Sequence, residues 1–212
     1  MKDILLFTTE NGAASLGLSQ IPYRREAYIR LQASAQPEEL LKECVSFSLA
    51  VGAEHVYAVG DGIEEGYPLY TRIIRMERPE LPVPIPHTTL CPVNEANLED
   101  WRGIYNSRME KVPGAVWMTR EDAAKARESG CLYFIYEEDL LLGIGMLRGR
   151  EVLGLAAIVP GGGSKILQTL LHAIPSGAAI LEVASENEKA VNLYKSFGFI
   201  EKEIITAWYK II

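Results

Sequence analysis

The sequence predicts an α/β protein (α+β) in which helices flank a mixed, mostly antiparallel sheet. Two observations indicate this class. Three apolar segments follow one another between residues 131 and 159 with only short turns between them, which is typical of an antiparallel meander. Beyond the meander, strand-like apolar runs alternate with segments whose apolar residues recur at helical spacing. With 212 residues, 48% of them hydrophobic, the chain can bury one large core or two smaller ones.

Composition narrows the classes of partner. The formal net charge of -7 argues against nonspecific nucleic-acid binding and favours a cationic or amine-bearing substrate over an acidic one. Cys44, Cys91 and Cys131 lack the paired spacing of a zinc site or a disulfide framework, so we expect reduced thiols, a cytoplasmic location and no metal. The first residues contain no long apolar segment. We therefore expect neither a secretory signal nor a membrane span.

Residues 1–77 are predicted to form a smaller N-terminal α/β domain. A helix should begin at Pro37, where a first-turn proline is tolerated, and end near Gly52. We expect loops after residue 7 and over 60–66. The predicted strands cover residues 4–7, 28–31, 55–59 and 71–76.

A weak internal similarity links the two halves of the sequence. Tyr70 follows Val59 by the same offset as Tyr194 follows Val183. Pro68 would break a helix at the corresponding position, and no glycine-rich segment precedes the first helix. The first half is then either a partial, degenerate copy of the second or similar to it by chance.

The segment 78–87, RPELPVPIPH, separates the two predicted domains. Its four prolines favour an extended, semi-rigid linker. The second domain then covers 88–212. The first domain could shape a substrate cleft, cover a sheet edge or contribute to a homodimer.

Strands and helices alternate along residues 88–212. Thr119 and Asp122 have capping-box spacing at the start of a helix that stops at Gly130. The other predicted helices cover 97–109, 165–174 and 188–197. The predicted strands cover 88–93, 131–136, 140–147, 151–159 and 180–183, followed by a terminal strand that contains Trp208 and Tyr209.

The stretch 181–199, LEVASENEKAVNLYKSFGF, is the most informative part of the chain. A strand leads into a helix for which Ser185 and Glu188 have capping-box spacing. Gly198 can adopt the left-handed conformation that ends a helix. The helix has one apolar face, so Tyr194 should point towards the sheet. The residues of that face are Ala190, Leu193, Tyr194 and Phe197.

The order V-x-x-x-N-x-x-A-x-x-L-Y-x-x-x-G-F in this stretch resembles the carboxy-terminal signature of the GNAT superfamily of acyl-CoA-dependent N-acyltransferases. The element order over 88–212 is similar to a complete GNAT domain. The resemblance implies that Asn187 contacts the cosubstrate and that Tyr194 lies beside its sulfur, where the phenol protonates the departing thiolate. The alternative is that Asn187 only guides the loop into the helix and Tyr194 is a packed core aromatic.

A glycine-rich segment joins the third meander strand to the next helix and predicts a pyrophosphate site. Amides at a helix amino terminus bind negative charge, and glycines permit close approach. The predicted cosubstrate-binding residues here are Ile158, Val159, Gly161, Gly162, Gly163, Ser164 and Lys165.

This segment departs from the family pattern. Val159 and Pro160 are adjacent, the usual Arg or Gln is missing, and Lys165 and Leu167 stand where small residues are usual. Their side chains could obstruct the phosphates. The alternative is a flexible connector that binds no ligand.

The resemblance implies direct acyl transfer from acetyl-CoA, or another acyl-CoA, to the primary amine of a small molecule or a peptide. An amide near Ile158 or Val159 would polarise the thioester carbonyl, while Tyr194 supplies the proton. Glu137, Glu138 and Glu151 are all candidates for the base, and the sequence does not choose among them. The rival hypothesis is a noncatalytic GNAT-like module that senses CoA or forms a protein interface.

Isolated histidines add no further site. His55, His87 and His172 belong to no motif, so we expect surface or packing roles for them.

Overall fold

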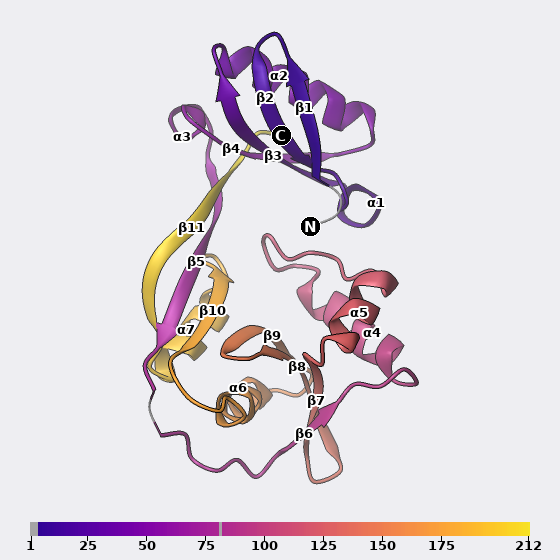
Figure 1. Ribbon diagram of the computed structural model, residues 1–212, viewed down its shortest axis with the longest axis vertical. Helices are drawn as coiled ribbons and strands as arrows, with labels where there is room; N and C mark the ends of the chain where they lie inside the picture. Colours follow the sequence, from indigo (N-terminus) through magenta and orange to yellow (C-terminus); the bar gives the residue numbers. More distant parts are fainter. Residues whose placement is uncertain (1–3, 81) are drawn as a thin grey trace. The chain divides into compact units, whose positions relative to one another are not determined.

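The computed structural model describes residues 4–80 and 82–212 (Figure 1). Residues 1–3, where we expect no secretory signal, and Leu81 of the predicted linker lie outside this part. The chain forms two compact units. The first contains the residues up to Arg72 together with Ile205–Ile212, and the second is Ile73–Ile204. Within the described residues, no helix is both long and apolar enough to cross a membrane.

The units differ in extent from the predicted domains 1–77 and 88–212 because two strands run through both units. These strands are β5 (Leu69–Arg78) and β11 (Ile200–Lys210). The predicted division at 78–87 stays a prediction.

The first unit is a sheet with one long helix, α2 (Pro37–Ala50). Its strands lie in the order β1 (Ile4–Thr9), β2 (Gly12–Gly17), β3 (Glu26–Ser34) and β4 (His55–Val59), followed by the end of β11. The first three pair antiparallel, β4 is parallel to β3, and β11 is antiparallel to β4. Apolar residues of α2 and the sheet form its core.

Two sequence-based assignments in this unit are wrong. The loop predicted after residue 7 contains β2, because small residues alternate in burial where we expected turn chemistry. The loops also contain two one-turn helices, α1 (Ile21–Arg24) and α3 (Ile63–Gly66), which are too short for a periodicity signal.

The second unit contains the predicted meander. It consists of β7 (Leu132–Glu137), β8 (Leu140–Arg148) and β9 (Glu151–Ala157), each antiparallel to the next one along the chain. Strand β6 (Thr89–Pro92) pairs antiparallel with β7. Beyond β9 come β10 (Ala179–Ala184), which is parallel to β9, and β5, which is antiparallel to β10. The predicted fold class, a mixed and mostly antiparallel sheet flanked by helices, is confirmed.

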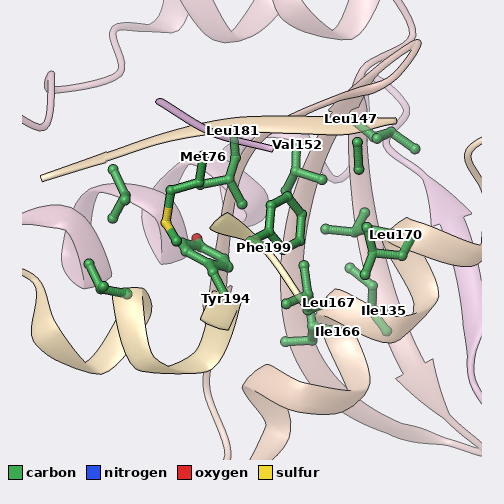
Figure 2. Close-up of a cluster of buried hydrophobic side chains, with 14 of the residues drawn as sticks. Met76, Ile135, Leu147, Val152, Ile166, Leu167, Leu170, Leu181, Tyr194 and Phe199 are labelled. Atoms are coloured by element: carbon green, nitrogen blue, oxygen red, sulfur yellow. The ribbon is translucent and has the colours of Figure 1, made fainter. Parts of the chain in front are cut away.

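Two cores form around this sheet. Helices α6 (Gly162–His172) and α7 (Glu188–Ser196) contribute to the first core, which is shown in Figure 2. Helices α4 (Leu98–Met109) and α5 (Arg120–Glu128) contribute to the second, where Trp101 is fully buried. The α5 cap is as predicted, since the Asp122 amide donates to Thr119 Oγ1 at 3.1 Å.

The cap of α7 differs from the prediction. Ser185 and Glu188 do not form a capping box, because the helix begins two residues later than that pattern requires. The N-cap is Asn187, and its side chain accepts a hydrogen bond from the Ala190 amide.

The two halves of the chain repeat one order of elements. Each half runs from an antiparallel strand pair through a helix to a parallel strand, a second helix and a last strand, as β2-β3-α2-β4-α3-β5 and β8-β9-α6-β10-α7-β11, and the first half has the one-turn helix α1 in addition, between β2 and β3. The last strands are exchanged, because β5 pairs with β10 and β11 with β4. This topology supports a structural repeat. The offset noticed in the sequence does not, since Tyr70 lies in a strand and Tyr194 in a helix.

Candidate functional site

The sheet of the second unit opens between its two neighbouring parallel strands. Strands β9 and β10 pair only at Glu151 with Ile180 and at Val152 with Leu181. On its other side, β9 carries a bulge at Leu153, because Leu147 pairs with Val152 while Met146 pairs with Gly154. A bulge bends the strand that contains it. Beyond this point β9 separates from β10.

A groove with a volume of about 570 Å³ lies at this opening. One wall comes from the end of β9 and the loop that follows it, and the other from the beginning of α7. The end of α4 also contributes. Of the residues predicted for the site, the groove is lined by Ile158, Val159, Gly161, Gly163, Ser164 and Asn187.

The three glycines open α6 in different ways. Gly161 is the N-cap, with a φ of 77° that favours glycine. Gly162 is buried, and a Cβ atom there would lie 2.9 Å from Val159 Cγ2, so it serves packing and does not line the groove. Helix α6 begins three residues earlier than predicted, at this glycine.

Two amides at the start of α6 have no acceptor. Within the described part of the chain, neither Gly163 nor Ser164 donates its backbone N–H to another group, whereas Gly162 donates to the Val159 carbonyl at 3.2 Å. The first amides of a helix carry the positive end of its dipole. This end of the groove therefore suits an anion.

Lys165 does not line the groove. Its ammonium group lies 2.5 and 2.6 Å from the two carboxylate oxygens of Glu137. Leu167 is buried in the core. Neither side chain obstructs the amides, so the two departures from the family pattern leave the groove open.

Two other cations line the groove, Arg108 at the end of α4 and Lys189 in the first turn of α7. Arg108 Nη2 donates to the Ile158 carbonyl at 3.3 Å. Sequence reasoning missed both residues. Lys189 follows Asn187 closely enough to have been a candidate, but Arg108 lies fifty residues from the loop and is placed by folding alone.

The amides of Ile158 and Val159 differ. Ile158 donates its amide to the Leu142 carbonyl at 2.9 Å, so this N–H cannot also bind a ligand oxygen. The Val159 amide has no acceptor among the described residues. Of the two candidate oxyanion donors, only Val159 is available.

The Asn187 side chain lies at the start of α7 and also beside the groove. Its Oδ1 atom accepts the Ala190 amide at 3.3 Å, while its side chain also lines the groove. The hydrogen bond to the Ala190 amide fits the alternative interpretation of Asn187, in which this residue guides the loop into the helix.

Tyr194 lies in the core of the second unit, 7% exposed, and does not line the groove. Its ring centroid is 5.8 Å from that of Phe199, and Figure 2 shows both rings in the cluster that contains Met76. Burial raises the pKa of Tyr194 to about 12. The preceding residue, Leu193, does line the groove.

The candidate bases lie elsewhere. Glu137 is paired with Lys165, Glu151 lies 2.7 Å from Arg148, and Glu138 occupies the β7–β8 turn. No carboxylate and no histidine lines the groove among the described residues. Within 4–80 and 82–212, no three His, Cys, Asp or Glu side chains gather as a metal site would require.

In the first unit, the two neighbouring parallel strands β3 and β4 do not separate as β9 and β10 do. Strands β3 and β4 pair over five residues, from Glu26 with His55 to Arg30 with Val59. The cavity beyond them is about 110 Å³, and Glu38 and Glu39 occupy the first turn of α2. Carboxylates at this helix end repel an anion.

Comparison with known proteins identifies the fold. No family model matches the sequence, and no curated protein matches it. A GCN5-related N-acetyltransferase from Sphaerobacter thermophilus is similar in structure, with a TM-score of 0.60 and 13% identity over 93% of this chain and 75% of its own. An acetyltransferase from the GNAT family from Colwellia psychrerythraea has a TM-score of 0.52 and 14% identity, over 97% of this chain and 84% of its own.

A functionally unknown conserved protein from Staphylococcus epidermidis gives a TM-score of 0.59 and 11% identity, over 99% of this chain and 94% of its own. Identities this low establish a common fold. The chain has the fold of the GCN5-related N-acetyltransferase superfamily, as the sequence resemblance predicts.

Proposed function

We propose that the protein is an acyl-CoA-dependent N-acyltransferase, specifically an N-acetyltransferase that transfers the acetyl group of acetyl-CoA directly to a primary amine. One observation carries this proposal. Strand β9 leaves β10 after Val152 and leads into α6, at whose amino terminus the amides of Gly163 and Ser164 have no acceptors among the described residues. An extended ligand with a pyrophosphate fits such an opening.

Two parts of the groove would hold the cosubstrate. The amides of Gly163 and Ser164 would bind the pyrophosphate, with Arg108 and Lys189 as the nearby cations. The edge of β9 beyond Val152 is unpaired on the β10 side, so its backbone groups would bind the amides of the pantetheine arm as a neighbouring strand does. Lys165 would remain with Glu137.

The chain's own groups then have distinct roles in the transfer. The amine nitrogen bonds to the thioester carbon and loses one proton to solvent, since no carboxylate or histidine lines the groove among the described residues, and the carbon–sulfur bond breaks. The Val159 amide would stabilise the negative charge that develops on the carbonyl oxygen. Tyr194 would give its phenol proton to the thiolate and recover one from solvent, which requires its hydroxyl, now buried beside Phe199, to reach the groove wall that Leu193 forms.

A noncatalytic acyl-CoA-sensing module is the second candidate. The observation in its favour is that Tyr194 lies in the core and that no carboxylate lines the groove among the described residues. This candidate predicts acyl-CoA binding without turnover.

Calorimetric titration of acetyl-CoA, CoA and a longer acyl-CoA into the full chain tests the groove. Ser164→Pro removes one free amide at the third helical position, where no intrahelical hydrogen bond is lost, and Ser164→Ala keeps that amide as the matched control. We expect micromolar binding that Ser164→Pro weakens at least about tenfold and Ser164→Ala leaves nearly unchanged. Folded protein that binds none of the three ligands would overturn both candidates.

Release of free CoA in the presence of varied amines separates the two candidates. Sustained multiple turnover that Tyr194→Phe lowers by about a hundredfold supports the transferase with Tyr194 as the acid. Tight binding without turnover for any amine supports the sensing module.

A further inference from the structure

A second cavity lies on the sheet of the second unit, next to the groove. Its volume is about 360 Å³, and all of its lining residues belong to Ile73–Ile204. It lies over the part of β9 and β10 that is still paired. Leu153 lines this cavity and Leu155 lines the groove, so two residues of β9, about 7 Å, separate them.

The floor of the cavity is a row of three residues across three strands. Ile180 of β10 pairs with Glu77 of β5 on one side and with Glu151 of β9 on the other. Side chains that are paired in this way point to one face of a sheet. Two carboxylates therefore flank an apolar floor, with their Cα atoms about 10 Å apart across two strand spacings.

The charges in the cavity favour a cation. Glu77, Glu151 and Glu182 line it together with two arginines, Arg75 and Arg148. Both arginines are already engaged: Arg75 contacts Glu182 at 3.0 Å and also Glu203, and Arg148 contacts Glu151 at 2.7 Å. Glu77 is half-buried and has no hydrogen-bond or ion-pair partner within the described part of the chain.

We propose that this cavity binds the distal ammonium group of a small-molecule diamine that serves as the acyl acceptor. This inference rests on the proposed function. Glu77 would be the principal contact, Glu151 the second, and Ile180 would support the methylene chain. Because Glu77 lies two strand spacings from β9, a linker of about 10 Å or more is needed to place the other amine at the groove, where it must be uncharged to attack the thioester.

Octane-1,8-diamine and octylamine are the matched probes, because they share a chain length that spans two strand spacings and differ in the distal charge. Calorimetric titration of each into the full chain, without cosubstrate, measures the cavity alone. We expect the diamine to bind at least about tenfold more tightly than octylamine, and Glu77→Gln to abolish this difference. Glu128→Gln, an exposed carboxylate on α5 with 69% side-chain exposure, is the control and should leave the difference unchanged.

Acyl-transfer kinetics with the same amines give the second readout. Glu77→Gln should raise the KM for the diamine about tenfold and leave the KM for octylamine unchanged. Equal binding of the two amines, or an equal effect of Glu77→Gln on both, would overturn the cavity assignment even if acyl transfer is observed. Glu77-dependent diamine binding without any transfer would instead support the cavity and contradict the transferase.

Discussion

Arg78 on β5 donates a hydrogen bond from Nε to the carbonyl of Phe197, at 2.7 Å, just beyond the end of α7. The Arg78 residue is only 8% exposed. The carbonyls at a helix carboxyl end carry its negative dipole, so a guanidinium group there is stabilising. A strand from the first half of the sequence thus holds the helix that carries Asn187, Leu193 and Tyr194.

Replacing Arg78 should disturb both stability and the groove. Arg78→Met keeps an unbranched apolar stem but removes the charged donor, so we expect a loss of about 1.5–3 kcal/mol in the free energy of unfolding. Acetyl-CoA binding should weaken because α7 loses a contact at its end. Denaturant unfolding and calorimetry measure the two effects.

Arg120→Met is the control for this change, since the Arg120 side chain is 80% exposed and pairs with the exposed carboxylate of Glu99. It should cost under about 1 kcal/mol. Arg78→Lys should recover part of the loss. Equal costs for Arg78→Met and Arg120→Met would show that the contact with Phe197 contributes nothing.

The pKa of Tyr194 predicts an alkaline loss of stability. Burial raises this pKa from 10.0 to about 12, so the phenol is protonated in both states below pH 10 and the full stability is present there. Between pH 10 and 12 the unfolded chain ionises first, and about 2–3 kcal/mol is lost. Tyr194→Phe should remove this part of the decline, as measured by unfolding at several pH values. An unchanged slope would contradict the buried pKa.

Gly162 should not tolerate a side chain. Because a Cβ atom there would lie 2.9 Å from Val159 Cγ2 and 3.4 Å from the Leu142 carbonyl oxygen, Gly162→Ala must displace Val159. We expect a cost of about 1–3 kcal/mol in thermal or denaturant unfolding. Gly103→Ala, at a helical glycine of α4 with nothing within 4 Å of the added atom, is the control and should be neutral or stabilising. A neutral Gly162→Ala variant would show that α6 can move away from the sheet.

The three thiols should react at different rates. Cys44 and Cys131 are buried, and burial raises the pKa of Cys44 to about 11 and also raises that of Cys131. Cys91 is partly exposed on β6. In the native protein, a thiol-specific chromogenic reagent should therefore label one thiol rapidly and the other two only on unfolding. Rapid labelling of all three would contradict the buried positions.

Much of the fold could be predicted because local signals agree with it. The meander, α2 and α7 follow from apolar periodicity with Gly and Pro at their ends. Strand β2 could not be predicted, because its sequence, GAASLG, has the composition of a loop and is held by pairing with β1 and β3.

The candidate site also contains residues that the local sequence pattern places and residues that it does not. Residues close in sequence, such as Gly163 and Ser164, could be placed together from the strand-loop-helix pattern. Arg108 could not, because its contact with Ile158 joins segments distant along the chain. The sequence predicts that Lys165 contacts the ligand. In the structure its ammonium group instead pairs with Glu137, which folding brings close to it.

The sequence alone was enough to predict the fold class, the order of elements over residues 88–212 and the loop that opens α6, because propensity, periodicity and capping act within a few residues. Only the tertiary structure decided which amides remain free, that β9 leaves β10 after Val152, and that Tyr194 lies in the core. These features depend on strand register, the bulge at Leu153 and the exchange of β5 and β11. Register and exchange are set by packing between distant segments, which a local pattern does not contain.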